Sequence, residues 1–141
     1  LLSFISPLFV IKNRSCVYDF NFHLVFVTKY RKSIFNTDEK RENMKSILMS
    51  IGIQNNVTIS NLEVTEDHVR MLISFKPKHA PASIVKSFKG TSAREWFKQY
   101  PETKKQLWRG HLWSPSYFMS TIGNVSEKIV NQYIENQMQK S

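Results

Sequence analysis

Hydrophobic and polar residues alternate most regularly along residues 68–75, and this alternation predicts a strand with two different faces. One face is apolar and is expected to point into a core; it consists of Val69, Met71, Ile73 and Phe75. The opposite face carries His68, Arg70, Leu72 and Ser74. Chemistry on this strand is therefore expected on the side turned away from the core.

Other segments follow one of two periodicities. Runs rich in aromatic and β-branched residues predict further strands at residues 17–28, 57–63 and 117–122. Apolar positions spaced three and four residues apart predict helices at residues 38–52, 81–100 and 126–139. In the first of these helices, Asn36 or Thr37 can cap the start and Gly52 suits the end.

The predicted order of elements is β-α-β-β-α-β-α. The first six match an α+β fold of the ferredoxin-like (RRM-like) kind, in which helices cover one face of an antiparallel sheet and leave the other face free for a ligand or partner. The last helix is an addition to that fold. We expect one domain over residues 17–141, preceded by an N-terminal extension of low order at residues 1–16.

Charge and cysteine content narrow the class of protein. The 141 residues include 20 Lys and Arg against 11 Asp and Glu, a formal net charge of +9, which favours a polyanionic partner such as nucleic acid. The single cysteine, Cys16, excludes an internal disulfide and fits a reducing cytoplasm. Residues 1–11 are apolar but too short to span a bilayer, so no membrane partner is expected.

Three groups of residues can carry chemistry. His68 lies on the polar face of its strand, two residues before Arg70. Tyr133 and Gln137 are four residues apart on the last helix and therefore project from one side of it. Cations and rings suited to phosphates and bases are also mixed along the chain, at Lys29, Tyr30, Arg31, Lys32, Lys86, Lys89, Arg94, Trp108, Arg109 and Trp113.

These residues stand in stretches that resemble a known family. The stretches are FHLVFVTKYRKSIF, LEVTEDHVRMLISF, SIVKSFKGTSAREWF, YPETKKQLW, GHLWSPSYFMSTIGNVSE and YIENQ, and they cover residues 18–137 in the family's order. The family is that of the small single-tyrosine HUH transposases of bacterial and archaeal insertion sequences, the "two hundred" type often called TnpA. A combination of this length is far more specific than one short motif.

The resemblance implies an activity and a set of site residues. Members bind hairpins at the ends of single-stranded element DNA, and they cleave and rejoin that DNA through a 5′-phosphotyrosine intermediate. The attacking tyrosine corresponds to Tyr133. Mg²⁺ or Mn²⁺ is held by a His-hydrophobic-His motif, of which His68 is the first residue, and a glutamine that corresponds to Gln137 assists. Members are homodimers whose tyrosine helix completes the partner's site, and DNA contacts are expected from Lys29 to Lys32 and from Lys86, Lys89 and Arg94.

The sequence departs from the family at the metal motif, which reads His68-Val69-Arg70. A guanidinium offers only donors and has no lone pair for a metal. Three interpretations remain open. The chain is a degenerate or domesticated transposase that still binds hairpin DNA or RNA; or Arg70 acts as a fixed cation beside the phosphate; or His23 or Glu66 replaces the missing ligand, the latter if the strand begins early.

Each feature also has a purely structural interpretation. Tyr133 lies in an apolar helix stripe and is suited to packing. Glu66 and Asp67 are typical turn residues, and Trp108 and Trp113 are typical core anchors. Gly90 in the basic helix indicates either a close approach or a break between two shorter helices.

Overall fold

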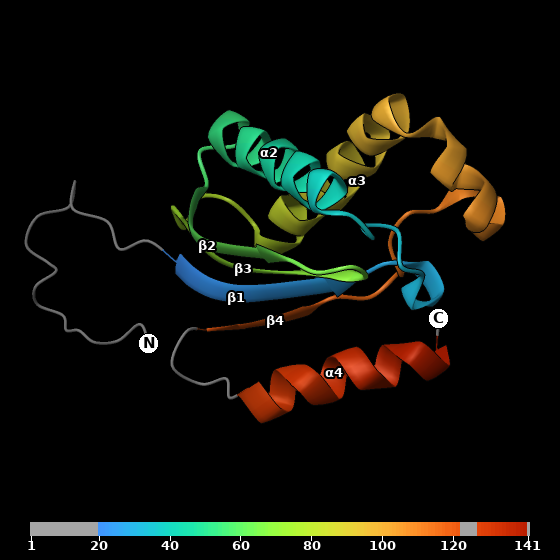
Figure 1. The fold of residues 1–141 in the computed structure, drawn as a ribbon. Coiled ribbons are helices and arrows are strands. Elements are labelled where there is room, and N and C mark those ends of the chain that lie inside the picture. Colours follow the sequence, from blue (N-terminus) through green and yellow to red (C-terminus); the bar gives the residue numbers. More distant parts are fainter. Residues whose placement is uncertain (1–19, 122–126, 141) are drawn as a thin grey trace, which may run out of the picture.

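A computed structural model describes residues 20–121 and 127–140 of the chain, and Figure 1 shows their arrangement. The strands are β1 Phe20–Val27, β2 Thr58–Val64, β3 His68–Phe75 and β4 Phe118–Thr121. The longer helices are α2 Asp38–Gln54, α3 Pro81–Gln99 and α4 Glu127–Lys140. Three short 3₁₀ helices connect them, η1 Lys29–Arg31, η2 Pro101–Gln106 and η3 Trp108–Gly110.

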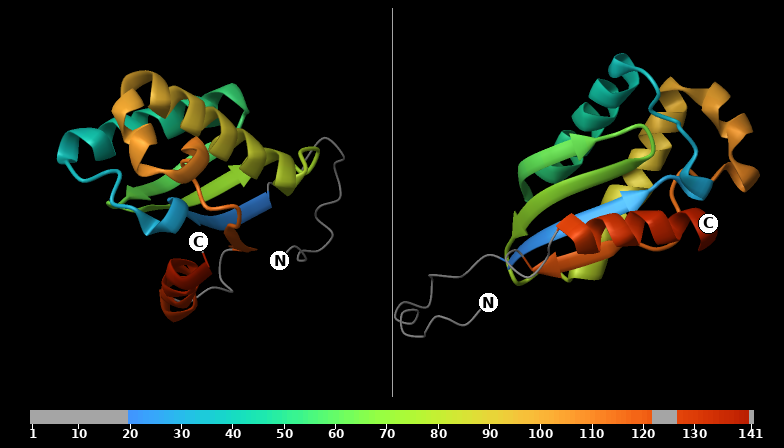
Figure 2. Two further views of the ribbon diagram at one scale, coloured as in Figure 1. Left: turned by 90° about the vertical axis from the view of Figure 1, so that its right-hand side faces the viewer. Right: turned by 60° about the horizontal axis from the view of Figure 1, so that its bottom comes forward.

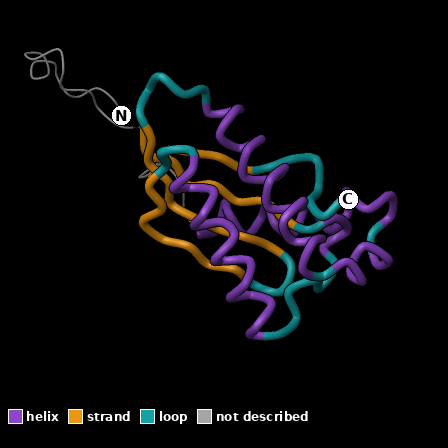
Figure 3. The backbone as a smooth tube through the Cα atoms, turned by 90° about the horizontal axis from the view of Figure 1, so that it is seen from above, coloured by secondary structure: helices purple, strands orange, loops and turns teal. Residues whose placement is uncertain are grey.

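The four strands form one antiparallel sheet in the order β2-β3-β1-β4. This is the strand order of the predicted ferredoxin-like fold, so the fold prediction is confirmed. The view in Figure 3 shows the helices lying across the strands. Because β1 pairs with β3 along its whole length, Val27 lies opposite His68 and Val25 lies opposite Arg70. His68 and Arg70 therefore stand on one of the two central strands of the sheet.

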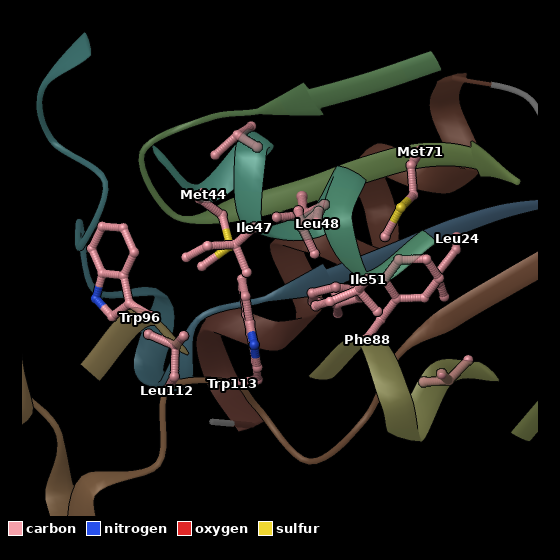
Figure 4. Close-up of a cluster of buried hydrophobic side chains, with 14 of the residues drawn as sticks. Leu24, Met44, Ile47, Leu48, Ile51, Met71, Phe88, Trp96, Leu112 and Trp113 are labelled. Carbon is pink, nitrogen blue, oxygen red and sulfur yellow. The ribbon is translucent and has the colours of Figure 1, made fainter. Parts of the chain in front are cut away.

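Helices α2 and α3 cover one face of the sheet and enclose the main hydrophobic core (Figure 4). The apolar face predicted for β3 is confirmed, since Val69, Met71, Ile73 and Phe75 are all at most 1% exposed. The prediction that Trp113 anchors the core is also confirmed. Its ring packs edge-on against Phe26 at a centroid distance of 4.6 Å, and its Nε1 donates to Ser92 Oγ over 2.9 Å.

Helix α4 lies on the opposite face of the sheet, alongside β1 and β4 (Figure 2). A second, smaller cluster holds it there, formed by the buried side chains Val25, Val27, Val130 and Ile134. The face that a ferredoxin-like fold leaves free is therefore covered in part by the chain's own last helix. Among the described residues, none of the helices has the length and hydrophobicity needed to cross a bilayer.

Some element boundaries differ from the prediction for identifiable reasons. Helix α2 continues two residues beyond Gly52, because this glycine serves a close approach rather than a helix end: a Cβ there would lie 3.0 Å from the Val57 carbonyl oxygen. The proposed break at Gly90 is wrong, since α3 is continuous and the space beside this glycine is open. The predictions for residues 1–19, Ile122, the Ser126 cap and the Trp108 side chain lie outside what the structure describes.

The predicted cap of α2 is confirmed at Thr37, whose hydroxyl accepts a hydrogen bond from the Lys40 backbone N–H over 3.2 Å. Changing Thr37→Ala leaves that N–H without its partner. We expect this to lower the free energy of unfolding by about 1 kcal/mol. Urea denaturation measures the loss, and Thr37→Ser, which keeps the acceptor, is expected to retain most of the stability.

Candidate active site

His68 begins β3 and is oriented by the residue before it. Its Nδ1 lies 2.9 Å from Asp67 Oδ1 and 2.8 Å from Thr65 Oγ1. The Thr65 hydroxyl also donates to the His68 carbonyl over 3.3 Å. Because an ionised carboxylate only accepts hydrogen bonds, the neutral imidazole has its proton on Nδ1, which leaves the lone pair on Nε2. A carboxylate behind the histidine is the usual support for a metal-binding imidazole.

Arg31 holds the other side of the same carboxylate. Its Nε and Nη2 lie 3.1 and 2.9 Å from Asp67 Oδ2, and its Nη1 donates to the Ile134 carbonyl of α4 over 3.3 Å. Tyr30 and Arg31 both have left-handed backbone angles, with φ of 57° and 51°, which cost energy in residues with a Cβ. The Thr28 hydroxyl supports this bend by donating to the Lys32 carbonyl over 2.8 Å. Arg31 thus links the His68 support to the tyrosine helix.

The environment of Asp67 keeps it ionised. Burial by itself would raise the pKa of this carboxyl, but the hydrogen bond with His68 and the positive charge of Arg31 outweigh it and lower the pKa below the ordinary 3.8. Asp67 is only 6% exposed. Its assignment as a simple turn residue is therefore incomplete, because the side chain joins Arg31 to His68.

Tyr133 and Gln137 lie together, as their spacing predicts, and Ser116 connects them. Ser116 Oγ is 3.2 Å from the Tyr133 hydroxyl and donates to Gln137 Oε1 over 2.8 Å. Ser114 Oγ donates to the same amide oxygen over 3.1 Å. Gln137 is buried, and Tyr133 is half-buried with its ring 5.8 Å from that of Phe118. Tyr133 therefore packs against the smaller cluster, as the structural interpretation predicts, while its hydroxyl is hydrogen-bonded to Ser116.

The tyrosine is protonated in this environment. Burial raises the pKa of Tyr133 above its ordinary value of 10.0, and the hydrogen bond with Ser116 offsets only part of that effect. A protonated phenol is a weak nucleophile. Attack on a phosphate therefore needs a group that stabilises the phenolate as DNA binds.

Arg70 lies on the same face of β3 as His68, as predicted. Its Nε is 3.7 Å from Glu63 Oε1 on the neighbouring strand β2, and Glu63 and Arg70 are paired in the sheet register. The Arg70 side chain is 18% exposed, whereas that of Glu63 is 58% exposed. Arg70 is thus packed along the sheet surface with a carboxylate beside it.

The donors around His68 fall short of a divalent-ion site. Among the described residues, no group of three His, Cys, Asp or Glu side chains could hold a metal. Gln137 could supply an oxygen, but that oxygen already accepts two serine hydroxyls. Two protein ligands do not amount to the six that Mg²⁺ needs unless water and DNA oxygens supply the rest.

Of the two substitute ligands considered from the sequence, His23 is remote from His68, whereas Glu66 lines the same surface hollow as His68. His23 pairs with Leu72, four residues along β3 from His68, which corresponds to about 13 Å at ~3.3 Å per residue. The early strand start that Glu66 required does not occur, because β3 begins at His68 and Glu66 is an exposed turn residue. His23 does line the same surface hollow as Arg70 and Glu63.

The predicted DNA contacts fall into two groups. Lys29, Tyr30 and Lys32 lie in or next to η1, which contacts α4, and the Lys29 ammonium is 5.1 Å from the Tyr30 ring centroid. Lys86 and Arg94 are exposed on α3, in the layer on the other face of the sheet. Of the same set, Arg31 and Lys89 make internal contacts: Arg31 with Asp67, and Lys89 with the carbonyls of Ser114 and Ser116.

Asp67, Ser114 and Ser116 are the functional candidates that the sequence did not reveal. Ser114 and Ser116 stand in an irregular segment with no periodicity, and their partners on α4 are 17 to 23 residues away along the chain. For Asp67 a signal existed, because an acidic residue directly before a candidate histidine ligand is placed to orient its ring.

Comparison with known proteins assigns a family to this arrangement. A family model described as "Transposase IS200 like" matches residues 16–137. The ISDra2 transposase TnpA of Deinococcus radiodurans is 39% identical over 136 residues, which are 96% of this chain and 96% of that protein. The crystal structure of a candidate transposase from Deinococcus radiodurans, 40% identical, superposes with a TM-score of 0.82 and covers 89% of this chain and 96% of the other.

A more distant structure shares the fold. It is a REP-associated tyrosine transposase bound to a REP hairpin, 12% identical with a TM-score of 0.55, and the match covers 93% of this chain and 69% of that one. At this identity the likeness concerns the fold alone. The family match and the identity to TnpA over nearly the whole chain decide the assignment: the chain belongs to the IS200-like transposase family.

Proposed function

We propose that this transposase-family chain binds single-stranded DNA hairpins, and that its ability to cleave them through Tyr133 is strongly impaired by Arg70. The observation that carries the proposal is the position of Arg70 on the His68 face of β3, beside Glu63. A fixed guanidinium there offers no lone pair and repels a divalent ion. The support of His68 by Asp67 is otherwise intact.

The reaction that is impaired is an exchange of one phosphodiester for another. Tyr133 Oη would bond to the phosphorus as the bond to the 3′ oxygen breaks, leaving a 5′-phosphotyrosine and a free 3′-OH. The phenol loses one proton and the departing 3′ oxygen gains one. The half-buried phenol is hydrogen-bonded to Ser116, whose hydroxyl also donates to Gln137. Mg²⁺ or Mn²⁺ would stabilise the charge that develops on the phosphate, and this chain's own donors for it are His68 Nε2 and Gln137 Oε1.

DNA binding does not require the metal ligand that is missing at position 70. The half-buried Lys29 and the exposed Tyr30 and Lys32 adjoin α4 through η1, and their charges and ring suit phosphates and unpaired bases. The hairpin-bound REP transposase supports hairpins as the substrate class. The homodimer with shared sites stays a prediction from the family resemblance.

The test combines binding with a search for a covalent adduct. The full chain is incubated with single-stranded hairpin DNA and Mg²⁺ or Mn²⁺ and examined on native and denaturing gels. We expect binding that weakens with salt and, at most, a trace of adduct, which Tyr133→Phe abolishes. Abundant adduct from the native chain would favour Arg70 as a working cation instead, and absence of hairpin binding would remove the proposal entirely.

A further inference from the structure

We propose that Lys89 is a positioning residue for Tyr133 and Gln137 rather than a DNA contact. Its Nζ donates to the carbonyl oxygens of Ser114 and Ser116 over 2.6 and 3.1 Å. Those are the two residues whose hydroxyls bond to Gln137, and Ser116 also bonds to Tyr133. One ammonium on α3 thus holds both ends of the segment that faces the tyrosine helix.

The segment needs such a donor because of its sequence. Residues 114–116 read Ser-Pro-Ser, and Pro115 has no N–H to contribute to a turn of its own. At its start the Ser114 backbone N–H is fixed by the Val27 carbonyl of β1 over 2.9 Å. Lys89 adds the contacts that keep both carbonyls turned toward α3. With the carbonyls fixed on that side, the Ser114 and Ser116 hydroxyls reach α4.

The position of the ammonium also argues against phosphate binding. Two of its donors are already bonded to carbonyl oxygens, and it lies 6.0 Å from the Tyr117 ring centroid. The side chain is half-buried, and this burial lowers the pKa of Lys89 to about 8. By contrast Lys86, one turn earlier on the same helix, is exposed. The two lysines therefore offer a matched comparison.

The experiment compares Lys89→Met with Lys86→Met, using Lys45→Met on α2 as a neutral control. Hairpin affinity is measured at several salt concentrations, and amide hydrogen exchange is followed by mass spectrometry. We expect Lys89→Met to change hairpin Kd less than about twofold while exchange rises in residues 112–118 and in α4. Lys86→Met is expected to weaken binding and to reduce its salt dependence. Lys89→Arg, which keeps two donors, is expected to restore most of the protection.

The catalytic readout rests on the proposed function and uses Arg70→His as the background. Adding Lys89→Met to it is expected to slow adduct formation at least ~10-fold at unchanged Kd. Ser116→Ala should produce the same slowing without touching α3, so it decides the point if Lys89→Met does not fold. A tenfold loss of hairpin affinity in Lys89→Met with unchanged exchange would overturn the proposal, as would no effect in any assay. If Arg70→His forms no adduct, the proposed impairment of cleavage by Arg70 is wrong, and exchange and affinity alone still decide the role of Lys89.

Discussion

Changing Arg70→His is expected to raise the yield of covalent DNA adduct at least ~100-fold over the native chain in Mg²⁺ or Mn²⁺. Residues two apart on a strand share a face, so an imidazole at this position stands beside that of His68. Even changes behind a metal ligand commonly cost ~10–100-fold in affinity or activity, so restoring a ligand is expected to exceed that range. The measurement is the adduct band on a denaturing gel over time.

Two comparison variants separate ligand from charge at position 70. Arg70→Met removes the positive charge without adding an oxygen or nitrogen ligand, and it is expected to leave the adduct near the native level. Arg70→Lys keeps the charge beside Glu63 and is expected to do the same. If the native chain is already active and Arg70→Lys keeps part of that activity while Arg70→His loses it, then the arginine is a functional cation and the metal explanation is wrong.

Asp67→Asn is expected to lower the free energy of unfolding by about 2 kcal/mol at neutral pH, because Arg31 and His68 both lose a charged acceptor in a buried position. In the Arg70→His background it is also expected to slow adduct formation about 10-fold, since the ring of His68 loses its charged hydrogen-bond acceptor. Urea denaturation gives the first quantity and the adduct assay gives the second.

The pH dependence of the stability lost in Asp67→Asn follows from the direction in which the pKa of Asp67 is shifted. The folded-state pKa is lower than the ordinary value of 3.8, so the stabilisation is complete above that value and is lost as the pH falls through the folded-state pKa. The difference between the native chain and Asp67→Asn is therefore expected to be constant at neutral pH and to narrow in acid. Glu42→Gln, an exposed carboxylate change on α2, is the control. Equal stability of Asp67→Asn and the native chain at pH 7 would contradict the buried pairing.

The sequence predicted the structure correctly where a single local pattern, such as strand alternation or a helix cap, determines it. Alternation alone identified β3 and both of its faces, and Thr37 marked the start of α2 through its capping oxygen. The end of α2 depended on a contact with Val57 that brings two separate segments together, so the local signal of Gly52 misplaced it. Helical spacing also brought Tyr133 and Gln137 to one side of α4.

Local sequence rules could not predict the contacts that hold the candidate site residues in place. Lys89 resembles any other lysine of a basic helix until the fold brings Ser114 and Ser116 under its ammonium. In the same way, Arg31 counts as one more cation in a basic cluster, yet it is paired with Asp67, which lies 36 residues away along the chain. A residue's type gave its chemistry, but only tertiary contacts gave its partner.

The buried side chains form two clusters, and this affects which substitutions thermal melting can detect. Within the described residues, α4 rests on the sheet through Val130 and Ile134, whereas α2 and α3 share the large cluster that includes Leu24, Phe26 and Trp96. Cooperative melting reports mainly on the larger cluster. Substitutions that weaken the packing of α4 can therefore displace Tyr133 and Gln137 in a chain whose melting temperature is unchanged. Measuring the melting temperature alone would not detect such variants.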